Sequence, residues 1–538
     1  MTVQASYSSG STAKPLLTET IGACLRRVAA ERPGGEALVD VPSGRRWTYA
    51  ELDHDVDELA RDLRARGVVK GDRVGIWAPN CPEWVLVQYA TARLGAVLVN
   101  INPAYRAHEL AYVLDQAGIS LLVSATSHRD SDYRAMVAEV AADCPGLRET
   151  LWIGDPSWQL KPGEGEFEEL DCHEPINVQY TSGTTGFPKG ATLSHHNILN
   201  NAHGVGALLG YTEQDRICVP VPFYHCFGMV LGNLAALSHR ACVIIPAAGF
   251  DPAATLRAVA AERATSLYGV PTMFIAELGL PDFASHDLSS LRTGLMGGSP
   301  CPVEVMKKVT SDMHMAEVAI AYGMTETSPV STLTRHDDDL AHRTETVGRV
   351  MPHVEVKIAD PATGATVDRG TPGELRTRGY SVMLGYWDDP ERTAEAVDEE
   401  GWMHTGDLAV MHEDGYVAIV GRIKDMIIRG GENVYPREIE EFLHRHPEIV
   451  DVQVVGVPDE RYGEEVFAFV ILRDPAATTL GQPELAEYCR GQLARYKTPR
   501  HVLVVDSFPM TVSGKVRKTE LRELAERSLR DAGASSQS

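Results

Sequence analysis

The sequence predicts an α/β protein with a large N-terminal domain and a small C-terminal α+β domain. Its 538 residues are enough for at least two domains. Helical and strand-like patterns alternate through roughly the first four hundred residues, which is typical of α/β architecture. Beyond the stretch 421–440 the predicted elements become shorter and more mixed. We therefore expect one domain over 1–421 and a second over 422–538.

The first elements of the large domain are predicted from a helix cap and from apolar periodicity. The stretch TYAE at 48–51 is a capping box that starts a helix. The apolar face of that helix is formed by Leu52, Val56, Leu59 and Leu63. Gly67 can end it. We expect a strand over 73–78, a helix over 84–94 and another strand over 96–103.

A loop rich in glycine and hydroxyl side chains, YTSGTTGFPKG, spans 180–190. A strand over 176–180 precedes it, with an apolar side made by Ile176, Val178 and Tyr180. Glycine lets backbone amides approach an anion, the hydroxyls add donors and Lys189 adds positive charge, so the loop suits phosphate. A flexible surface loop would explain this stretch alone equally well. Because Gly190 follows Lys189, the loop is not a Walker A motif.

Further elements extend the alternation into the small domain. Ser194 is placed to cap a helix, so the phosphate loop joins a strand region to a helix with several residues between them. The apolar face of that helix is formed by Ile198, Ala202, Val205 and Leu209. In the small domain we expect strands over 452–455, 466–472 and 501–505, and a helix over 485–496. The final DAGASSQS is typical of a disordered tail.

Composition narrows the class of protein. The formal net charge of −24 argues against nucleic acid as a bulk partner, because no basic surplus is available to displace counterions. The nine cysteines form no C-x-x-C pair, which indicates reduced thiols and a cytoplasmic protein. Polar residues interrupt the apolar stretch 85–99, so we expect no membrane span.

Six motifs in order make the chain similar to the adenylate-forming superfamily of acyl-CoA synthetases, peptide-synthetase adenylation domains and luciferases. They are YTSGTTGFPKG, PFYHCFG from Pro222, AYGMTE from Ala321, WMHTGDL from Trp402, GRIKDMIIRGGENVYP from Gly421 and MTVSGKVRK from Met510. The resemblance covers roughly 17–524, and the wording is most similar to medium-chain acyl-CoA synthetases of the family member 2 kind. It implies a large α/β domain with a distorted β-barrel subdomain and a small, mobile C-terminal α+β domain.

The resemblance assigns an ATP site. By it, the phosphates are held by Thr181, Ser182, Gly183, Thr184, Thr185, Gly186 and Lys189. Thr181 and Glu326 would hold Mg²⁺, a hard cation that prefers oxygen ligands. The adenine side would be lined by Gly298, Ser299, Pro300, Tyr322, Gly323 and Thr325. Asp407 would bind the ribose, and Arg422 would assist the ribose and phosphate. Taken singly, an Asp after a Gly is more often a turn residue and a tyrosine more often simple packing.

The resemblance also implies the catalytic groups and the acyl pocket. Lys515 would neutralise charge during adenylation, although a lysine in a charged patch is usually solvated. His225 would line the junction of acyl group and phosphate; a lone His beside aromatics is more often a hydrogen-bonded core residue. The acyl pocket candidates are His225, Met229, Gly232, Tyr268, Met296, Gly297 and Met324. Met229 stands where some long-chain relatives carry a gating tryptophan.

The implied reaction is that of an acid–thiol ligase using ATP and CoA. The small domain would rotate between the two steps about a hinge that the resemblance places at Asp425 or its neighbour Lys424, of which we choose Lys424. Gly430 and Gly431 would make room for pantetheine. We expect medium-chain acids and small-molecule partners; the sequence leaves the oligomeric state open, with a homodimer as one option. An adenylating enzyme that loads a carrier protein is the alternative, and a luciferase-like oxidase would share the adenylation motifs. A nucleotide-binding regulator is disfavoured by the intact Thr181, Glu326 and Lys515.

Overall fold

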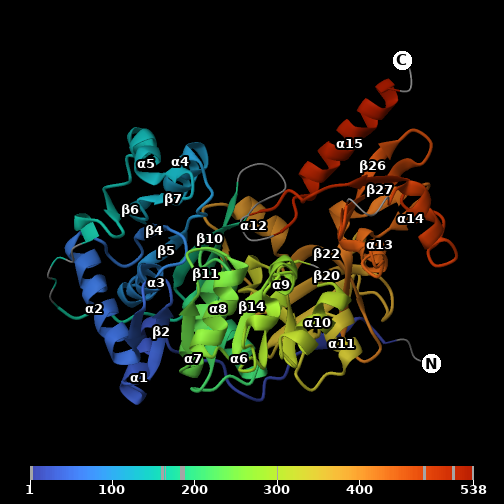
Figure 1. The fold of residues 1–538 in the computed structure, drawn as a ribbon. Coiled ribbons are helices and arrows are strands. Elements are labelled where there is room, and N and C mark those ends of the chain that lie inside the picture. The colour runs from blue at the N-terminus through green and yellow to red at the C-terminus, as the bar shows by residue number, and fades with distance from the viewer. Residues whose placement is uncertain are drawn as a thin grey trace.

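The chain folds into a large N-terminal domain and a small C-terminal domain, as the sequence predicts (Figure 1). The computed structural model describes 4–158, 161, 163, 165–181, 188–299, 301–475, 480–511 and 515–535. In Figure 1 the elements coloured blue through yellow to light orange form the large domain, and the last, dark orange and red elements stand to one side with α15 (Lys518–Ser535) at the edge.

The first sheet of the large domain carries the phosphate loop. Within the described chain it has seven strands in the order β21-β11-β10-β5-β4-β6-β9. Their bounds are Gly385–Tyr386, Lys189–Ser194, Pro175–Thr181, Val97–Asn100, Arg73–Trp77, Ile119–Ser124 and Glu149–Trp152. The strands from β10 to β9 are parallel, and most of the residues in β10, β5, β4 and β6 are buried. This confirms the strands expected near 73–78, 96–103 and 176–180.

A second sheet carries the motifs around Gly298 and Tyr322. Over the described residues its order is β18-β17-β16-β15-β14-β12-β13-β2-β3. Their bounds are Arg349–Val350, Val330–Leu333, Glu317–Gly323, Thr293–Gly297, Ser266–Gly269, Arg216–Cys218, Cys242–Ile245, Glu36–Asp40 and Arg45–Thr48. The strands from β16 to β2 are parallel, and both edges are closed by antiparallel strands. Loops after β15 and β16 therefore leave the sheet at the same edge.

Helices pack on these sheets where the apolar patterns predict them. The helices of the large domain are α1 to α12, at Ile21–Glu31, Tyr49–Ala65, Pro82–Leu94, Ala107–Gln116, Tyr133–Val140, His195–Leu208, Ala235–His239, Pro252–Glu262, Pro271–Leu278, Val303–Asp312, Leu340–Glu345 and Pro390–Ala396. The capping box of α2 forms as expected, with Thr48 and Glu51 bonded reciprocally. Ser194 likewise caps α6. A π-helix spans Phe227–Leu234, and π-helical turns often mark functional sites.

The structure shows what lies between the phosphate loop and the helix that follows it. The several residues expected there form β11, which returns antiparallel beside β10 before α6 begins. The loop is therefore the connection of a hairpin. The large domain also contains a third sheet, of order β1-β19-β20-β22-β23 among the described residues. Its strands run Tyr7–Ser9, Val354–Ala359, Gly373–Gly379, Met403–Met411 and Val417–Arg422, with antiparallel pairing throughout.

The small domain has its own sheet and its own apolar core. Among the described residues its strands are β24 to β28, at Ile427–Arg429, Glu432–Val434, Ile449–Asp459, Gly463–Leu472 and His501–Val504. Its helices are α13 (Pro436–Leu443), α14 (Gln482–Cys489) and α15. The helix expected over 485–496 ends early, and Gly491 beyond it has a φ of 73°, outside the helical region. The expected tail is helical as far as Ser535.

Candidate active site

The phosphate-loop hairpin brings a threonine and a lysine side by side. Thr181 ends β10 and lies opposite Lys189, the first residue of β11. The loop between them, 182–187, lies outside the described residues. It contains five of the predicted phosphate ligands, Ser182, Gly183, Thr184, Thr185 and Gly186. The two described residues thus mark the base of the loop.

The predicted metal ligands meet at this base. The Thr181 hydroxyl donates to Glu326 Oε1 over 3.4 Å. Glu326 lies in the 3₁₀ turn Thr325–Thr327 and is buried. Tyr386 of β21 donates its hydroxyl to the same carboxylate oxygen at 2.9 Å, and its ring lies 4.9 Å below the Lys189 ammonium. A hydroxyl and a carboxylate oxygen held together in this way form a donor set suited to Mg²⁺.

A second carboxylate joins the second and third sheets of the large domain. Asp407 accepts the Tyr322 hydroxyl at 2.8 Å through Oδ2 and the Arg422 guanidinium at 2.9 Å through Oδ1. Asp407 and Arg422 are also register partners on β22 and β23. Burial raises the pKa of Tyr322, and the Asp407 carboxylate beside it adds to this. The predicted ribose ligand, its arginine and the predicted adenine-side tyrosine therefore form one hydrogen-bonded group.

Lys515 comes to this group from the small domain. Its Cε would lie 3.5 Å from a Cβ placed on Gly298, so the side chain reaches the loop after β15. Burial lowers the pKa of Lys515, Arg422 lowers it further, and Asp407 and Glu326 oppose them. Lys515 is thus half-buried against the large domain and is not a fully solvated surface charge. Its part in catalysis remains a prediction.

His225 is held as a neutral imidazole next to Lys515. The Phe227 backbone amide donates to His225 Nδ1 at 3.1 Å, which places the proton of the neutral ring on Nε2. Burial lowers the pKa of His225 to about 3, and the Lys515 charge contributes. The ring therefore offers a hydrogen-bond donor and is not a base poised to change charge near neutral pH.

The remaining ATP-site predictions cluster on the loops after β15 and β16. Gly298 has a φ of 83°, and a Cβ on Gly323 would lie 1.8 Å from the Pro329 carbonyl oxygen, so both positions require glycine. Ser299 follows Gly298, while Pro300 lies outside the described residues. Thr325 is buried, and its hydroxyl lies 3.6 Å from Cys226 Sγ beside His225.

The acyl-pocket candidates surround the π-helix. Met229, Tyr268 and Met296 are buried, and Met324 packs against the same core. The Tyr268 hydroxyl donates to the Leu231 carbonyl at 3.0 Å, which ties β14 to the π-helix. A Cβ at Gly232 would meet the Val219 side chain at 2.9 Å, and one at Gly297 would meet the Ala321 carbonyl oxygen at 2.8 Å. These glycines allow close protein packing.

The predicted hinge and CoA glycines lie in the connection to the small domain and in its first hairpin. Lys424 lies in the 3₁₀ turn Ile423–Asp425 between β23 and β24. Gly430 and Gly431 form the two-residue turn between β24 and β25, with φ of 61° and 88°. Two positive φ values match a type I′ hairpin turn, which explains the glycine pair on structural grounds. Their contact with CoA remains a prediction.

Sequence reasoning missed two groups of supporting residues. Tyr386, which holds both Glu326 and Lys189, carried no signal beyond an aromatic residue in GYW. Asn100 donates to the Tyr224 carbonyl at 2.9 Å and so supports the loop that carries His225. Asn177 in turn donates to Asn100 Oδ1 at 3.0 Å. Such partners come from distant strands, so spacing in the sequence gave no indication of them.

Family models match both parts of the chain. The model described as AMP-binding enzyme matches residues 25–387, and the model described as AMP-binding enzyme C-terminal domain matches 438–515. The chain belongs to the AMP-binding enzyme family. The resemblance predicted from the six motifs is confirmed, and so is the division into a large and a small domain.

Named relatives match this chain over nearly their whole length. The putative acyl-CoA synthetase YngI of Bacillus subtilis (strain 168) is 49% identical over 537 residues, covering 94% of this chain and 97% of that protein. The mitochondrial medium-chain acyl-CoA ligase ACSF2 of Homo sapiens is 42% identical, with 97% and 90% covered.

Solved structures show the same fold. The ATP-bound structure of MatB from Rhodopseudomonas palustris superposes with a TM-score of 0.82 at 32% identity, covering 94% of this chain and 99% of that one. The anthranilate CoA ligase AuaEII in complex with anthranoyl-AMP gives a TM-score of 0.87 at 26% identity, with 96% and 98% covered.

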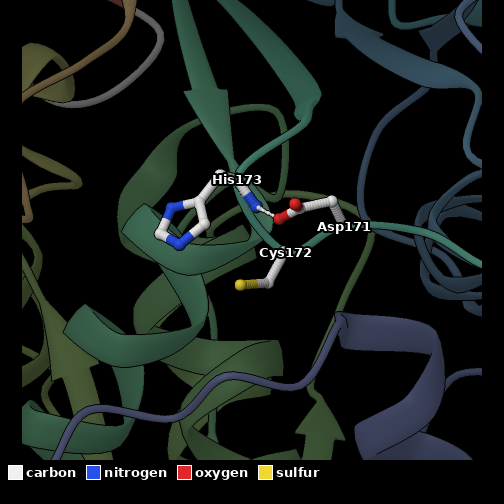
Figure 2. Close-up of side chains that lie close together, drawn as sticks. All are labelled: Asp171, Cys172 and His173. Atoms are coloured by element: carbon white, nitrogen blue, oxygen red, sulfur yellow. Dashed lines mark hydrogen bonds between the residues drawn. The ribbon is translucent and has the colours of Figure 1, made fainter.

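A separate group of metal-ligating side chains lies before β10. Figure 2 shows Asp171, Cys172 and His173, whose ligand atoms lie within 4.8 Å of one another. The Asp171 carboxylate already accepts the His173 backbone amide at 2.8 Å, and burial raises the pKa of the Cys172 thiol. Both features favour a neutral thiol in an ordinary turn that leads into the strand, so we assign no metal to it.

Membrane and redox features complete the description. A membrane-crossing helix, which needs length and apolarity together, does not occur among the described residues. All nine cysteines lie within the described ranges and are free thiols, as the sequence predicts.

Proposed function

We propose that this enzyme is an acyl-CoA synthetase that joins a medium-chain carboxylic acid to CoA at the expense of ATP, releasing AMP and pyrophosphate through an acyl-adenylate. The observation that carries the proposal is Lys515: a lysine of the small domain reaches Gly298 of the large domain and lies within the electrostatic field of Asp407 and Glu326. Adenylation brings two anionic reactants together and so needs a cation at that point. The small domain supplies such a cation beside the adenine-side loop and near two carboxylates of the proposed nucleotide site. The names of the relatives YngI and ACSF2 support the same reaction.

ATP binding would use the two described ends of the phosphate loop and the Asp407 group. Lys189 supplies positive charge for the terminal phosphates, and Asp407 can accept ribose hydroxyls with the lone pairs left by Tyr322 and Arg422. Thr181 and Glu326 offer hard oxygen donors and fit Mg²⁺. When bound there, Mg²⁺ would neutralise charge on the phosphates of ATP.

In the first step, a carboxylate oxygen of the acid attacks the α-phosphorus of ATP. A new P–O bond forms, the bond to the bridging oxygen breaks, and pyrophosphate leaves with that electron pair. The Lys515 ammonium lies where negative charge on the two reactants converges, so its attraction increases toward the transition state. The Nε2–H of His225 can donate to the carboxylate or to the α-phosphate.

In the second step, the sulfur of CoA attacks the carbonyl carbon of the adenylate, AMP leaves, and the thiol proton passes to solvent. Lys515 is not required for this step. We propose that the small domain rotates about Lys424 between the steps and brings Gly430 and Gly431 to the pantetheine. Hinge closure of this type is common in two-domain enzymes.

A medium-chain acid is proposed because the pocket candidates are apolar and flexible. Met229, Met296 and Met324 can repack around chains of different length. The pocket candidates include no Lys or Arg that could bind a second carboxylate of a dicarboxylic acid. The relatives named medium-chain acyl-CoA ligase support this choice. We further propose a cytoplasmic enzyme, in keeping with nine free thiols, and leave room for a homodimer.

The test is a panel of acids from acetate to palmitate, with succinate and benzoate, assayed for CoA-dependent AMP formation. We expect octanoate to give a kcat/KM at least tenfold above acetate and succinate. A preference for either of those acids would overturn the substrate proposal. AMP formation that needs a carrier protein in place of CoA would overturn the assignment of the acceptor.

A further inference from the structure

The chain passes from the large to the small domain in four residues. Arg422 is the last residue paired to the third sheet, opposite Asp407. Ile427 is the first residue paired to the small domain's sheet, opposite Val434. The turn between them is closed by the Met426 amide, which donates to the Arg422 carbonyl at 3.0 Å. Any rotation of the small domain must be absorbed in this turn.

The last residue of the turn is bound to the small domain by an arginine. Arg522 Nη2 donates to Asp425 Oδ1 at 2.6 Å and lies 3.5 Å from the Lys424 carbonyl oxygen. The pair is partly shielded, because 30% of the arginine side chain and 15% of the aspartate side chain are exposed. One guanidinium therefore holds both a side chain and the peptide bond between Lys424 and Asp425.

Arg522 is itself fixed to the small domain. It lies in the second turn of α15, between Leu521 and Ala525, which are fully buried. These two residues pack in the same core cluster as Val455 of β26 and Phe467 of β27. The guanidinium therefore moves as one body with the small domain's sheet.

The two contacts of Arg522, with the Asp425 carboxylate and with the Lys424 carbonyl, restrict which backbone torsions can change while both contacts stay intact. Rotation about φ and ψ of Lys424 turns its carbonyl, Asp425 and Arg522 together, so both Arg522 contacts survive. Rotation about the torsions of Asp425 would separate the Lys424 carbonyl from Arg522. We infer that Arg522 is a positioning residue that binds Asp425 to the small domain and so confines the domain rotation to Lys424.

The inference rests on the two-step reaction and domain rotation proposed above. It predicts that the hinge can be relocated by removing the arginine. Lys424→Pro fixes φ at Lys424 near −65° and should block rotation while Arg522 holds Asp425. In the double variant Lys424→Pro/Arg522→Ala, Asp425 is released and can absorb part of the rotation.

The experiment measures both half-reactions in the full chain. Pyrophosphate release from octanoate plus ATP reports adenylation, and thioester formation from supplied octanoyl-adenylate plus CoA reports the second step. We expect Lys424→Pro to lower the second step at least 30-fold, and Arg522→Ala to restore it at least fivefold in the double variant. Arg517→Ala is the matched control. Arg517 lies directly before α15 and pairs with Glu520 of that helix, so its replacement in the Lys424→Pro variant should restore no activity in the second step.

Each result is decisive. Recovery with Arg522→Ala but not with Arg517→Ala supports the inference, and absence of recovery overturns it. If Arg522→Ala alone lowers both half-reactions equally, and Asp425→Asn does the same, the pair has only a structural role and the inference fails. If the wild-type enzyme releases no pyrophosphate with any acid of the panel, the proposed function fails instead, which is a different outcome from normal adenylation with an unresponsive hinge.

Discussion

Replacing Lys515 with alanine should separate the two half-reactions more sharply than any other single change. The ammonium lies beside Gly298 and within the field of Asp407 and Glu326, where the nucleotide and the acid are expected to meet. Loss of one preorganised donor to a developing negative charge costs about 100- to 1000-fold in rate, or about 3–4 kcal/mol. Lys515→Ala should therefore lower adenylation by that factor, measured as pyrophosphate release from acid plus ATP.

The same variant should leave the second step nearly intact. We expect thioester formation from supplied acyl-adenylate and CoA to stay within about threefold of wild type, since the step does not use this lysine. Lys518→Ala is the matched control, because Lys518 binds Glu440 and the Val454 carbonyl inside the small domain. Normal adenylation by Lys515→Ala, or an equal loss of both steps, would refute the reasoning.

Three further predictions follow from single contacts. Burial and Arg422 lower the pKa of Lys515, and the protonated lysine is the active form, so kcat/KM for adenylation should fall as the pH rises, at a pH below the ordinary lysine range. Lys515→Arg should move this fall to higher pH or remove it. A pH profile that this substitution leaves unchanged would contradict the assignment. Tyr386→Phe removes the 2.9 Å bond to Glu326 but keeps the ring under Lys189, so kcat/KM for ATP should fall about tenfold, and an unchanged value would show that the bond is not needed. The Glu277 carboxyl is buried without a hydrogen-bond partner among the described residues, and burial raises its pKa well above 4.5. The folded protein therefore keeps a proton that the unfolded chain loses, so the free energy of unfolding declines as the pH rises from about 4.5. Glu277→Met should raise the free energy of unfolding at pH 7 by roughly 1–3 kcal/mol in denaturant titrations and flatten that decline, and a destabilised variant would contradict this.

The sequence predicted elements where local signals are strong. The capping boxes at Thr48 and Ser194 and the apolar strand around Arg73–Trp77 formed as expected, because caps and apolar runs act within a few residues. The sequence did not predict elements whose formation depends on a partner strand far along the chain. The strand β11 after the phosphate loop is fixed by its partner β10, and no local pattern announced it. The helix near 485–496 ended early beside Gly491, whose backbone conformation sequence periodicity does not reveal.

For the site, motif resemblance predicted the residues and the structure supplied their partners. Thr181 and Glu326, 145 positions apart, were assigned to one metal and meet at 3.4 Å. Tyr386 was not predicted, because a single tyrosine has no pattern that separates a partner of Glu326 from ordinary packing. Gly232 packs against Val219, a neighbour that the absence of a side chain in the sequence could not indicate.

The pairing of Asp407 with Arg422 places the proposed ribose ligand next to the proposed hinge. Arg422 is both the partner of Asp407 and the residue directly before Ile423, where the interdomain turn begins. A ribose hydroxyl that competes for Asp407 would therefore act on a side chain two positions from Lys424. Under the proposed roles, binding of the sugar and rotation of the small domain involve adjoining residues, and one turn of backbone is enough to couple them.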